Sequence, residues 1–329
     1  MEVSMHYHYI GIDVSKKELF TFDGKKVRKF PNNPNLIKFD GFLKKRALPV
    51  EKTIILFEST GVYSSYLKHY CAENGYKAFV VNPKRSANFV KALGNRSKTD
   101  QIDSKALYEF KNVIKPEEAS VPFIDEAAEK LNAYLTSYQF IMKLKQATSN
   151  HLEALNNSKN APKKLVSAIK CEHNRLNKLE KKIIDEATNY CKTDSELKED
   201  FENLTSITSI GDISAVALIC LFRKYPDTNR AQITALVGLD PTKRESGTSV
   251  RGRMKISKNG FAMVRKILYF PTMNAIQNNI HIKPFYDRLI IKHKLKKIAL
   301  IAAMKKLLLI AHAVYNNKTK YKKELGVCV

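Results

Sequence analysis

Short apolar runs alternate with helical segments over the first 115 residues, and this alternation limits the fold more than any other feature of the sequence. Residues 7–14, 18–23 and 26–30 are predicted to form a three-stranded meander, in which Asp23-Gly24 supplies a turn and basic residues follow it. The segments that follow are a predicted helix over 35–46, a strand over 53–57, a helix over 62–74, a strand over 77–82 and helical segments from 83 onward.

This order of elements, a strand meander followed by alternating helices and strands, is that of an RNase H-like (RuvC-like) α/β domain. We therefore expect residues 1–115 to form such a domain.

Four acidic residues occupy related places in this pattern. Asp13 and Glu58 each end an apolar run, and Asp100 and Asp103 lie three residues apart in a predicted helix. The carboxyl ends of neighbouring strands lie side by side, and residues i and i+3 share a helix face, so the four side chains are able to converge.

The convergence of these four acids would have a chemical consequence. A single Asp after a strand is usually a turn or cap residue, but four carboxylates within about 6 Å repel one another unless a cation neutralises them. Oxygen ligands of this kind suit Mg²⁺ and a two-metal phosphoryl-transfer site.

The composition indicates the substrate. The 329 residues contain 57 Lys and Arg against 32 Asp and Glu, a net charge of +25 that is spread along the chain. Such a surface attracts a polyanion, most obviously nucleic acid, although a ribosomal or membrane-surface protein has the same excess. Because 44% of the residues are hydrophobic, the chain is long and apolar enough to bury one or two cores.

The sequence predicts a cytoplasmic, nucleoid-associated protein that does not interact with membranes. The N-terminus lacks a signal-peptide pattern, and the most apolar stretch, 298–314, is interrupted by Lys305 and Lys306. The cysteines are odd in number and form no CxxC pair, so we expect reduced thiols rather than disulfides or a zinc site. They are Cys71, Cys171, Cys191, Cys220 and Cys328.

The middle of the chain predicts two long helices. Gly is absent from 124–155 and from 162–190, and apolar residues recur there at heptad-like spacing. The break at 156–162, which ends in Pro162, supplies the turn of an antiparallel hairpin. We expect residues 116–198 to form a helical hairpin or coiled coil that dimerises the protein or separates two domains; the alternative is that the helices only fill a core.

The remaining residues, 199–329, are expected to form a mainly helical domain. Residues 204–215 are similar to a helix-hairpin-helix, in which the backbone N–H groups after a tight glycine turn hold a DNA phosphate. Only Gly211 is present where two glycines are usual, and Asp212 follows it, so an ordinary turn between helices is the alternative.

A second segment of this domain is rich in glycine and cations. Residues 237–260 are predicted to form a loop in which basic residues surround Ser246 and Ser249, before a helix that carries Arg265. A serine in such a loop most often binds phosphate and rarely acts as a nucleophile. The cations that we expect to contact nucleic acid are Lys98, Lys243, Arg244, Arg251, Arg253, Lys255, Lys258 and Arg265.

These motifs together resemble a known family over nearly the whole chain. GIDVSKK at 11–17, ESTGVY at 58–63, KTDQIDSKAL at 98–107 and GLDPTKRESG at 238–247 are similar to motifs of the bacterial insertion-sequence DEDD transposases. Those enzymes join a RuvC-like N-terminal domain to a serine-bearing C-terminal transposase domain, and they are bridge-RNA-guided DNA recombinases.

The resemblance implies roles for individual residues. Asp13, Glu58, Asp100 and Asp103 would bind Mg²⁺, and Ser246 would attack DNA. One departure is Glu245, which stands where many relatives have a second serine. The partners implied are donor and target DNA, a structured noncoding bridge RNA that chooses both by base pairing, and further copies of the chain in dimers that pair into tetramers.

The sequence thus predicts a DNA transposase or recombinase that depends on Mg²⁺ and a serine nucleophile. The alternative enzyme is a RuvC-like structure-specific endonuclease in which metal-activated water attacks and Ser246 only binds phosphate. A non-catalytic nucleic-acid-binding protein is the third interpretation, and the repulsion among the four acids disfavours it.

Overall fold

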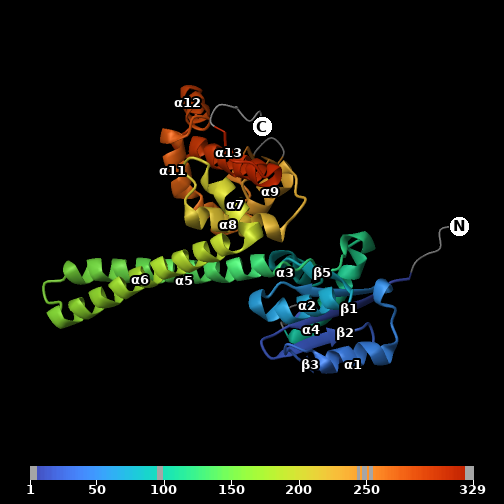
Figure 1. Cartoon of the computed structure of the whole chain (residues 1–329). Coiled ribbons are helices and arrows are strands. Elements are labelled where there is room, and N and C mark those ends of the chain that lie inside the picture. The colour runs from blue at the N-terminus through green and yellow to red at the C-terminus, as the bar shows by residue number, and fades with distance from the viewer. Residues whose placement is uncertain (1–5, 95–98, 243–244, 247–249, 252–254, 323–329) are drawn as a thin grey trace. The chain divides into compact units, whose positions relative to one another are not determined.

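A computed structural model describes residues 6–94, 99–242, 245–246, 250–251 and 255–322. The chain divides into two compact units, Met1–Ile124 and Asp125–Val329 (Figure 1). The helical hairpin belongs to the second of these units, and the boundaries expected from the sequence at 116–198 and 199–329 stay a prediction.

The first unit is built on a mixed five-stranded sheet of order β3-β2-β1-β4-β5. The meander β1–β3 is antiparallel, whereas β4 and β5 run parallel to β1. The predicted strands are confirmed to within a residue or two at each end. Their bounds are His8–Val14 (β1), Glu18–Phe22 (β2), Val27–Pro31 (β3), Thr53–Glu58 (β4) and Lys77–Val81 (β5).

Helices cover both faces of this sheet because its central strands are apolar on both sides. Ile10 and Ile12 of β1 pack with α1 and α2, whereas Ile54 and Leu56 of β4 pack with the opposite layer, which includes α4. The helices are α1 (Ile37–Arg46), α2 (Ser65–Glu73), α3 (Pro83–Ala92) and α4 (Asp100–Glu109), with 3₁₀ turns at Val50–Lys52, Gly61–Ser64, Phe110–Asn112 and Pro116–Glu118.

The contact between α4 and β1 is a backbone contact. A Cβ at Gly11 would overlap the carbonyl oxygen of Ser104 and the N–H of Tyr108, and would lie 2.8 Å from the Cα of Tyr108. Only a residue without a side chain allows the helix to lie this close to the strand. Gly11 therefore fixes the height of α4 above the sheet.

We predict that Gly11→Ala destabilises the first unit. Its Cβ meets backbone atoms that cannot rotate away, so α4 must shift, at a cost of about 1–3 kcal/mol in the free energy of unfolding. Urea denaturation followed by circular dichroism measures this loss.

Gly41→Ala is the matched control. Gly41 lies inside α1, and no atom of the described residues is within 4 Å of the place that a Cβ would occupy there. This variant should be neutral or more stable by up to about 1 kcal/mol. Equal stability of the two variants would contradict the role assigned to Gly11.

The second unit begins with the two long helices predicted from the sequence, α5 (Glu126–Asn156) and α6 (Lys163–Thr193). They lie side by side as a hairpin (Figure 1). Asp125 caps α5 by accepting a hydrogen bond from the Ala128 N–H, and its carboxylate also pairs at 2.9 Å with Arg223, which belongs to helix α8 (Asp212–Lys224). Pro162 is the N-cap of α6 and does not enter the helix.

Seven further helices complete this unit among the described residues. The most buried are α8 and α13; nine consecutive side chains of α8, from Ser214 to Phe222, are buried. The bounds are Ser195–Thr205 (α7), Asp212–Lys224 (α8), Arg230–Val237 (α9), Ala262–Ile267 (α10), Tyr269–Asn278 (α11), Lys283–Ile291 (α12) and Lys296–Asn317 (α13).

Helix α13 is long and apolar enough to cross a membrane by length and composition alone. More than half of its apolar window, 56%, is buried inside the unit, where Leu307, Leu308 and Ala311 join the core. The Lys306 ammonium donates to the His281 carbonyl at 3.0 Å and lies over the Phe285 ring. These contacts are those of a core helix in a globular unit.

Candidate active site

The strand register sets Asp13 and Glu58 next to each other. Parallel pairing of β1 with β4 runs from His8 opposite Thr53 to Ile12 opposite Phe57, and the two acids are the next residues of their strands. Both side chains are half-buried. The neighbouring positions of two acids at strand ends, expected from the sequence, are therefore present.

The alternation of side chains along a strand turns both acids toward the same layer. Asp13 comes two residues after Gly11, which meets α4, so it faces the same side of the sheet as Gly11. Glu58 likewise faces the same side as Ile54 and Leu56, which pack in the layer that includes α4. Asp13 and Glu58 thus lie on the face of the sheet that α4 covers.

The other two acids lie in the first turn of α4. Asp100 is the first residue of the helix and is exposed, whereas Asp103 is half-buried and lies one residue before Ser104, which meets Gly11. The Thr99 hydroxyl caps the helix by accepting from the Ile102 N–H at 3.3 Å. Acidic residues stabilise this end of a helix through its dipole, so the fold tolerates both carboxylates there.

The four acids have the donor chemistry of a Mg²⁺ site, since all their ligand atoms are oxygens. Within the part of the chain that the structure describes, however, no three His, Cys, Asp or Glu side chains are grouped closely enough to hold a metal ion. The fold thus brings together the elements that carry these acids, and it does not bring the carboxylates into a coordination cluster. Lys98, the cation expected beside them, lies outside the described residues.

The segment with the candidate nucleophile is a β-hairpin in its described parts, and not the loop predicted from its glycines. Strand β6 (Pro241–Thr242) pairs with β9 (Lys255–Ile256), and β7 (Glu245–Ser246) pairs with β8 (Val250–Arg251), both antiparallel. The strands leave little signal in the sequence because each has only two residues. Ser246 lies opposite Val250, in the outer of the two strand pairs.

The root of this hairpin is closed tightly. Gly238 has a φ of +69° and Gly260 a φ of +94°, and a Cβ at either position would overlap backbone of the opposite arm. The Phe261 N–H donates to the Leu236 carbonyl at 2.9 Å, and the Ser257 hydroxyl pairs with the Asp240 carboxylate. The two ends of the segment are thus joined before the hairpin begins.

Arg265 completes this root. Its guanidinium donates to the Val237 carbonyl at 2.6 Å and to the Lys258 carbonyl at 3.2 Å, one on each arm. Burial lowers the pKa of Arg265 from its usual value. The sequence suggested that this residue contacts nucleic acid, and in the structure its guanidinium binds these two backbone carbonyls.

The other predicted nucleic-acid contacts are distributed along the hairpin. Lys255 and Lys258 are exposed near its root, and Arg251 lies in β8 opposite Glu245. Lys243, Arg244 and Arg253 lie outside the described residues. The roles of these cations toward nucleic acid stay predictions.

Two features of the site were not predicted from the sequence. The first is the backbone contact at Gly11, whose signal is a glycine inside a buried strand, where glycine is otherwise unfavourable. The second is the pair of Asp240 and Ser257, seventeen residues apart, for which the sequence offers no signal.

Two models of transposase families match the chain. The first, described as a transposase of the DEDD type of IS110 elements, matches residues 10–158, which include all four acids. The second, described as the transposase IS116/IS110/IS902 family, matches residues 201–287, which include the serine hairpin. The chain belongs to the IS110-type family of DEDD transposases. The resemblance expected from the sequence motifs is thereby confirmed.

Two curated relatives of this transposase family extend over nearly the whole chain. Both are called pilin gene-inverting protein, one from Moraxella lacunata and one from Moraxella bovis. Each is 24% identical in an alignment of 327 positions that covers 96% of this chain and 98% of the relative. Membership of the family makes the chain a transposase or recombinase that acts on DNA.

We predict that Arg265→Lys loosens the serine hairpin. A single ammonium cannot span the carbonyls of both arms as the planar guanidinium does, so either the partly buried bond to Val237 or the exposed bond to Lys258 would be lost, at a cost of about 0.5–1.5 kcal/mol. Hydrogen exchange read by mass spectrometry should therefore accelerate in peptides that cover 238–260.

Arg230→Lys is the control, because Arg230 is exposed in the first turn of α9. It should leave exchange in the hairpin unchanged. Unaltered exchange in the Arg265→Lys protein would show that the root is held by the glycines and the strand pairs alone.

Proposed function

We propose that this transposase is a Mg²⁺-dependent DNA recombinase whose first unit is an RNase H-like (RuvC-like) catalytic domain. The observation that carries the proposal is the common direction of Asp13 and Glu58, at adjacent strand ends, toward the layer that contains α4 with Asp100 and Asp103. An arrangement of acids around one edge of a sheet serves phosphoryl transfer better than it serves stability, because like charges repel.

Asp13, Glu58, Asp100 and Asp103 would hold the metal in this proposal. Bound Mg²⁺ supplies charge neutralisation for the oxygens of the scissile phosphate. Asp100 is exposed and begins its helix, so its carboxylate is able to reorient when a metal and DNA arrive. The half-buried Asp13 and Glu58 would form the fixed part of the site.

Ser246 would be the nucleophile. Its Oγ attacks a DNA phosphorus and loses its proton, one P–O bond of the strand breaks, and the released deoxyribose oxygen takes up a proton. The phosphoserine ester keeps the energy of the broken bond, so a hydroxyl of a second strand can attack it, release Ser246 and join the strands. The closed root of the hairpin supports this role, because it restricts where Ser246 can go.

The proposed reaction fits the name of the relatives. Inversion of a gene requires that strands be cut and rejoined at two sites, and a covalent serine intermediate provides this without loss of DNA ends. We therefore propose donor and target DNA as the substrates. A structured bridge RNA that selects them, and dimers that pair into tetramers, complete the proposal; in such an assembly the acids of one copy can meet Ser246 of another.

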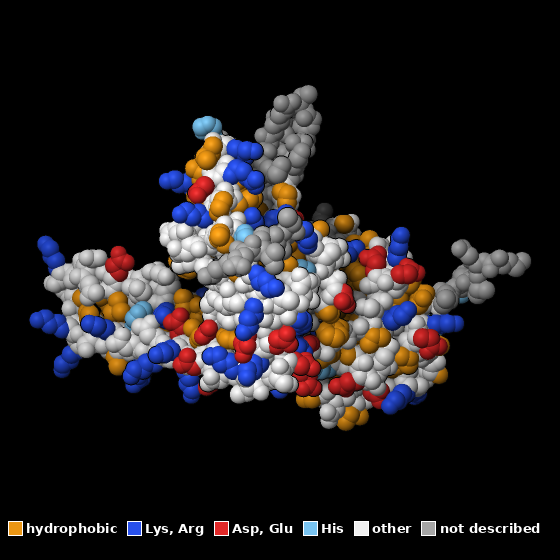
Figure 2. All heavy atoms as spheres, turned by 45° about the horizontal axis from the view of Figure 1, so that its top comes forward, with side chains coloured by type: hydrophobic (Ala, Val, Ile, Leu, Met, Phe, Trp, Pro, Cys, Tyr) orange, Lys and Arg blue, Asp and Glu red, His pale blue; other side chains and the backbone are white. Residues whose placement is uncertain are grey.

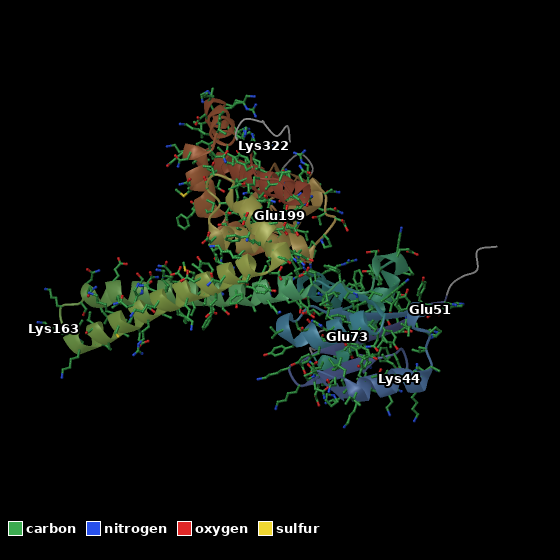
Figure 3. The ribbon with its side chains drawn as sticks, in the orientation of Figure 1. Lys44, Glu51, Glu73, Lys163, Glu199 and Lys322 are labelled. Atoms are coloured by element: carbon green, nitrogen blue, oxygen red, sulfur yellow. The ribbon has the colours of Figure 1, made fainter. Side chains whose placement is uncertain are left out.

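The helical hairpin supports the affinity for nucleic acid. Between residues 143 and 182 it carries ten Lys or Arg against the three acids Glu153, Glu172 and Glu180. Figure 2 shows Lys and Arg prevailing over acids on this part of the face in view. Lys163 lies at the turn end of the hairpin and is exposed (Figure 3). A surface of this charge binds phosphates without reading sequence.

The metal site is tested by Asp13→Asn and Asp103→Asn. Each variant should abolish strand cleavage and leave DNA binding unchanged or tighter, because a negative charge near the phosphate is removed. Cleavage of a labelled element end, with Mg²⁺ and with EDTA, measures the first effect, and a filter-binding assay the second. Cleavage at the wild-type rate in EDTA would contradict the metal proposal.

The nucleophile is tested by Ser246→Ala, with Ser249→Ala as a control in the same segment. Loss of Ser246 should stop strand exchange and remove a covalent protein–DNA adduct that denaturing gels detect with the wild-type protein. Ser249→Ala should retain both. If Ser246→Ala still nicks DNA at a normal rate and no adduct can be trapped, the alternative of an endonuclease with a water nucleophile is correct.

A further inference from the structure

A groove in the second unit takes no part in the chemistry proposed above. It lies between α5, the start of α8 and the α10–α11 segment, and its volume is about 870 Å³. This is within the range of small-molecule sites, which are about 300–1,000 Å³. Among the described residues that line the groove are none of the four acids and no residue of the serine hairpin.

One wall of the groove is aromatic and apolar. The Phe270 side chain is 74% exposed and stands edge-on to Tyr269, with ring centroids 5.6 Å apart. Met142, which is 38% exposed, and the half-buried Tyr138 lie on α5 across from it. A phenylalanine ring this exposed, within a lined groove, offers a flat surface for a ligand.

The polar part of the lining is cationic and amidic. Lys143 of α5 and Lys266 of α10 both line the groove and are exposed, and no Asp or Glu is among the lining residues that the structure describes. The amides of Gln139 and Asn274 add donors and acceptors. Cations and amides beside an aromatic surface match a nucleotide, which has a phosphate, hydrogen-bonding edges and a π-face.

The start of α8 adds donors on the third side. Gly211 is its N-cap and lines the groove, and within the described chain no side chain caps the N–H groups of this helix turn. Exposed Asp212 follows in the first turn, outside the lining, and opposes an anion there. The helix-hairpin-helix signal in the sequence therefore coincides with one edge of the groove, which Phe270 and the two lysines complete.

We propose that this groove binds an unpaired stretch of nucleic acid, with a base stacked on Phe270 and the flanking phosphates near Lys143 and Lys266. In a duplex each base is covered by its neighbours, so only an unpaired base can present its face to the ring. Strand exchange creates such bases. The inference rests on the proposal that nucleic acid is the substrate, and it is independent of Ser246 and the four acids.

Phe270→Ala tests the stacking. The probe is a single-stranded oligonucleotide that contains a fluorescent adenine analogue, whose emission falls when it stacks, and the same sequence as a duplex serves for comparison. We expect about tenfold weaker binding of the single strand and loss of the quenching, with duplex binding unchanged.

Phe140→Ala is the matched control, because Phe140 is a 59% exposed phenylalanine of α5 that does not line the groove. It should bind both probes as the wild type does. Circular dichroism confirms that each variant is folded, and removal of an exposed ring is not expected to disturb the core.

The cations are tested by the double variant Lys143→Gln/Lys266→Gln. Each lost phosphate contact should reduce the slope of log affinity against log salt by about 0.7 for a single strand, so about 1.4 in total. Asp212→Asn should act in the opposite direction and tighten binding.

Two results would overturn the proposal. Equal losses of single-strand and duplex affinity in the Phe270→Ala protein would assign the groove to duplex backbone. Unchanged binding of both probes, with a change of oligomeric state in sedimentation, would make it a contact between copies of the chain. All variants are made in the Ser246→Ala protein, which serves as the reference in place of the wild type, so a failure of the recombinase chemistry leaves this test intact.

Discussion

The arrangement of the first unit depends on the approach of α4 to β1 at Gly11. The backbone of α4 contacts Gly11 at Ser104 and Tyr108, and atoms in such close contact cannot approach further, so this contact sets the height of α4 above the sheet. The start of the same helix carries Asp100 and Asp103. The position of two of the four acids is thus set by a residue that has no side chain.

Much of the first unit was predictable because its signals are local. Apolar runs precede Asp13 and Glu58, which lie at or next to the ends of the strands over 8–14 and 53–58, and the two long helices of the second unit are free of glycine over some thirty residues each. The spacing of apolar residues, together with the Gly and Pro residues that end helices and strands, is enough to predict such elements. The common direction of Asp13 and Glu58 also follows from strand alternation once the parallel register is known.

The serine segment was predicted less well, for a physical reason. Its strands are two residues long, so neither alternation nor propensity identifies them, and they exist because Gly238, Gly260 and Arg265 close the root. Arg265 is a second example. Its charge led us to expect a contact with a nucleic-acid phosphate, but in the structure its guanidinium donates to the carbonyls of Val237 and Lys258. The short strands and the partners of Arg265 both depend on contacts between residues distant in sequence, and such contacts cannot be read from a single sequence.

The closed root has a consequence for how this transposase family can vary. Closing a loop costs entropy that grows only with the logarithm of its length, and here that cost is met by hydrogen bonds located before β6 and after β9. Residues at the far end of the hairpin can therefore be inserted, deleted or exchanged with little effect on the stability of the helical core. The base of the segment is thus held by residues outside its strands, and the proposed position of Ser246 in β7 depends on that base rather than on the length of the segment.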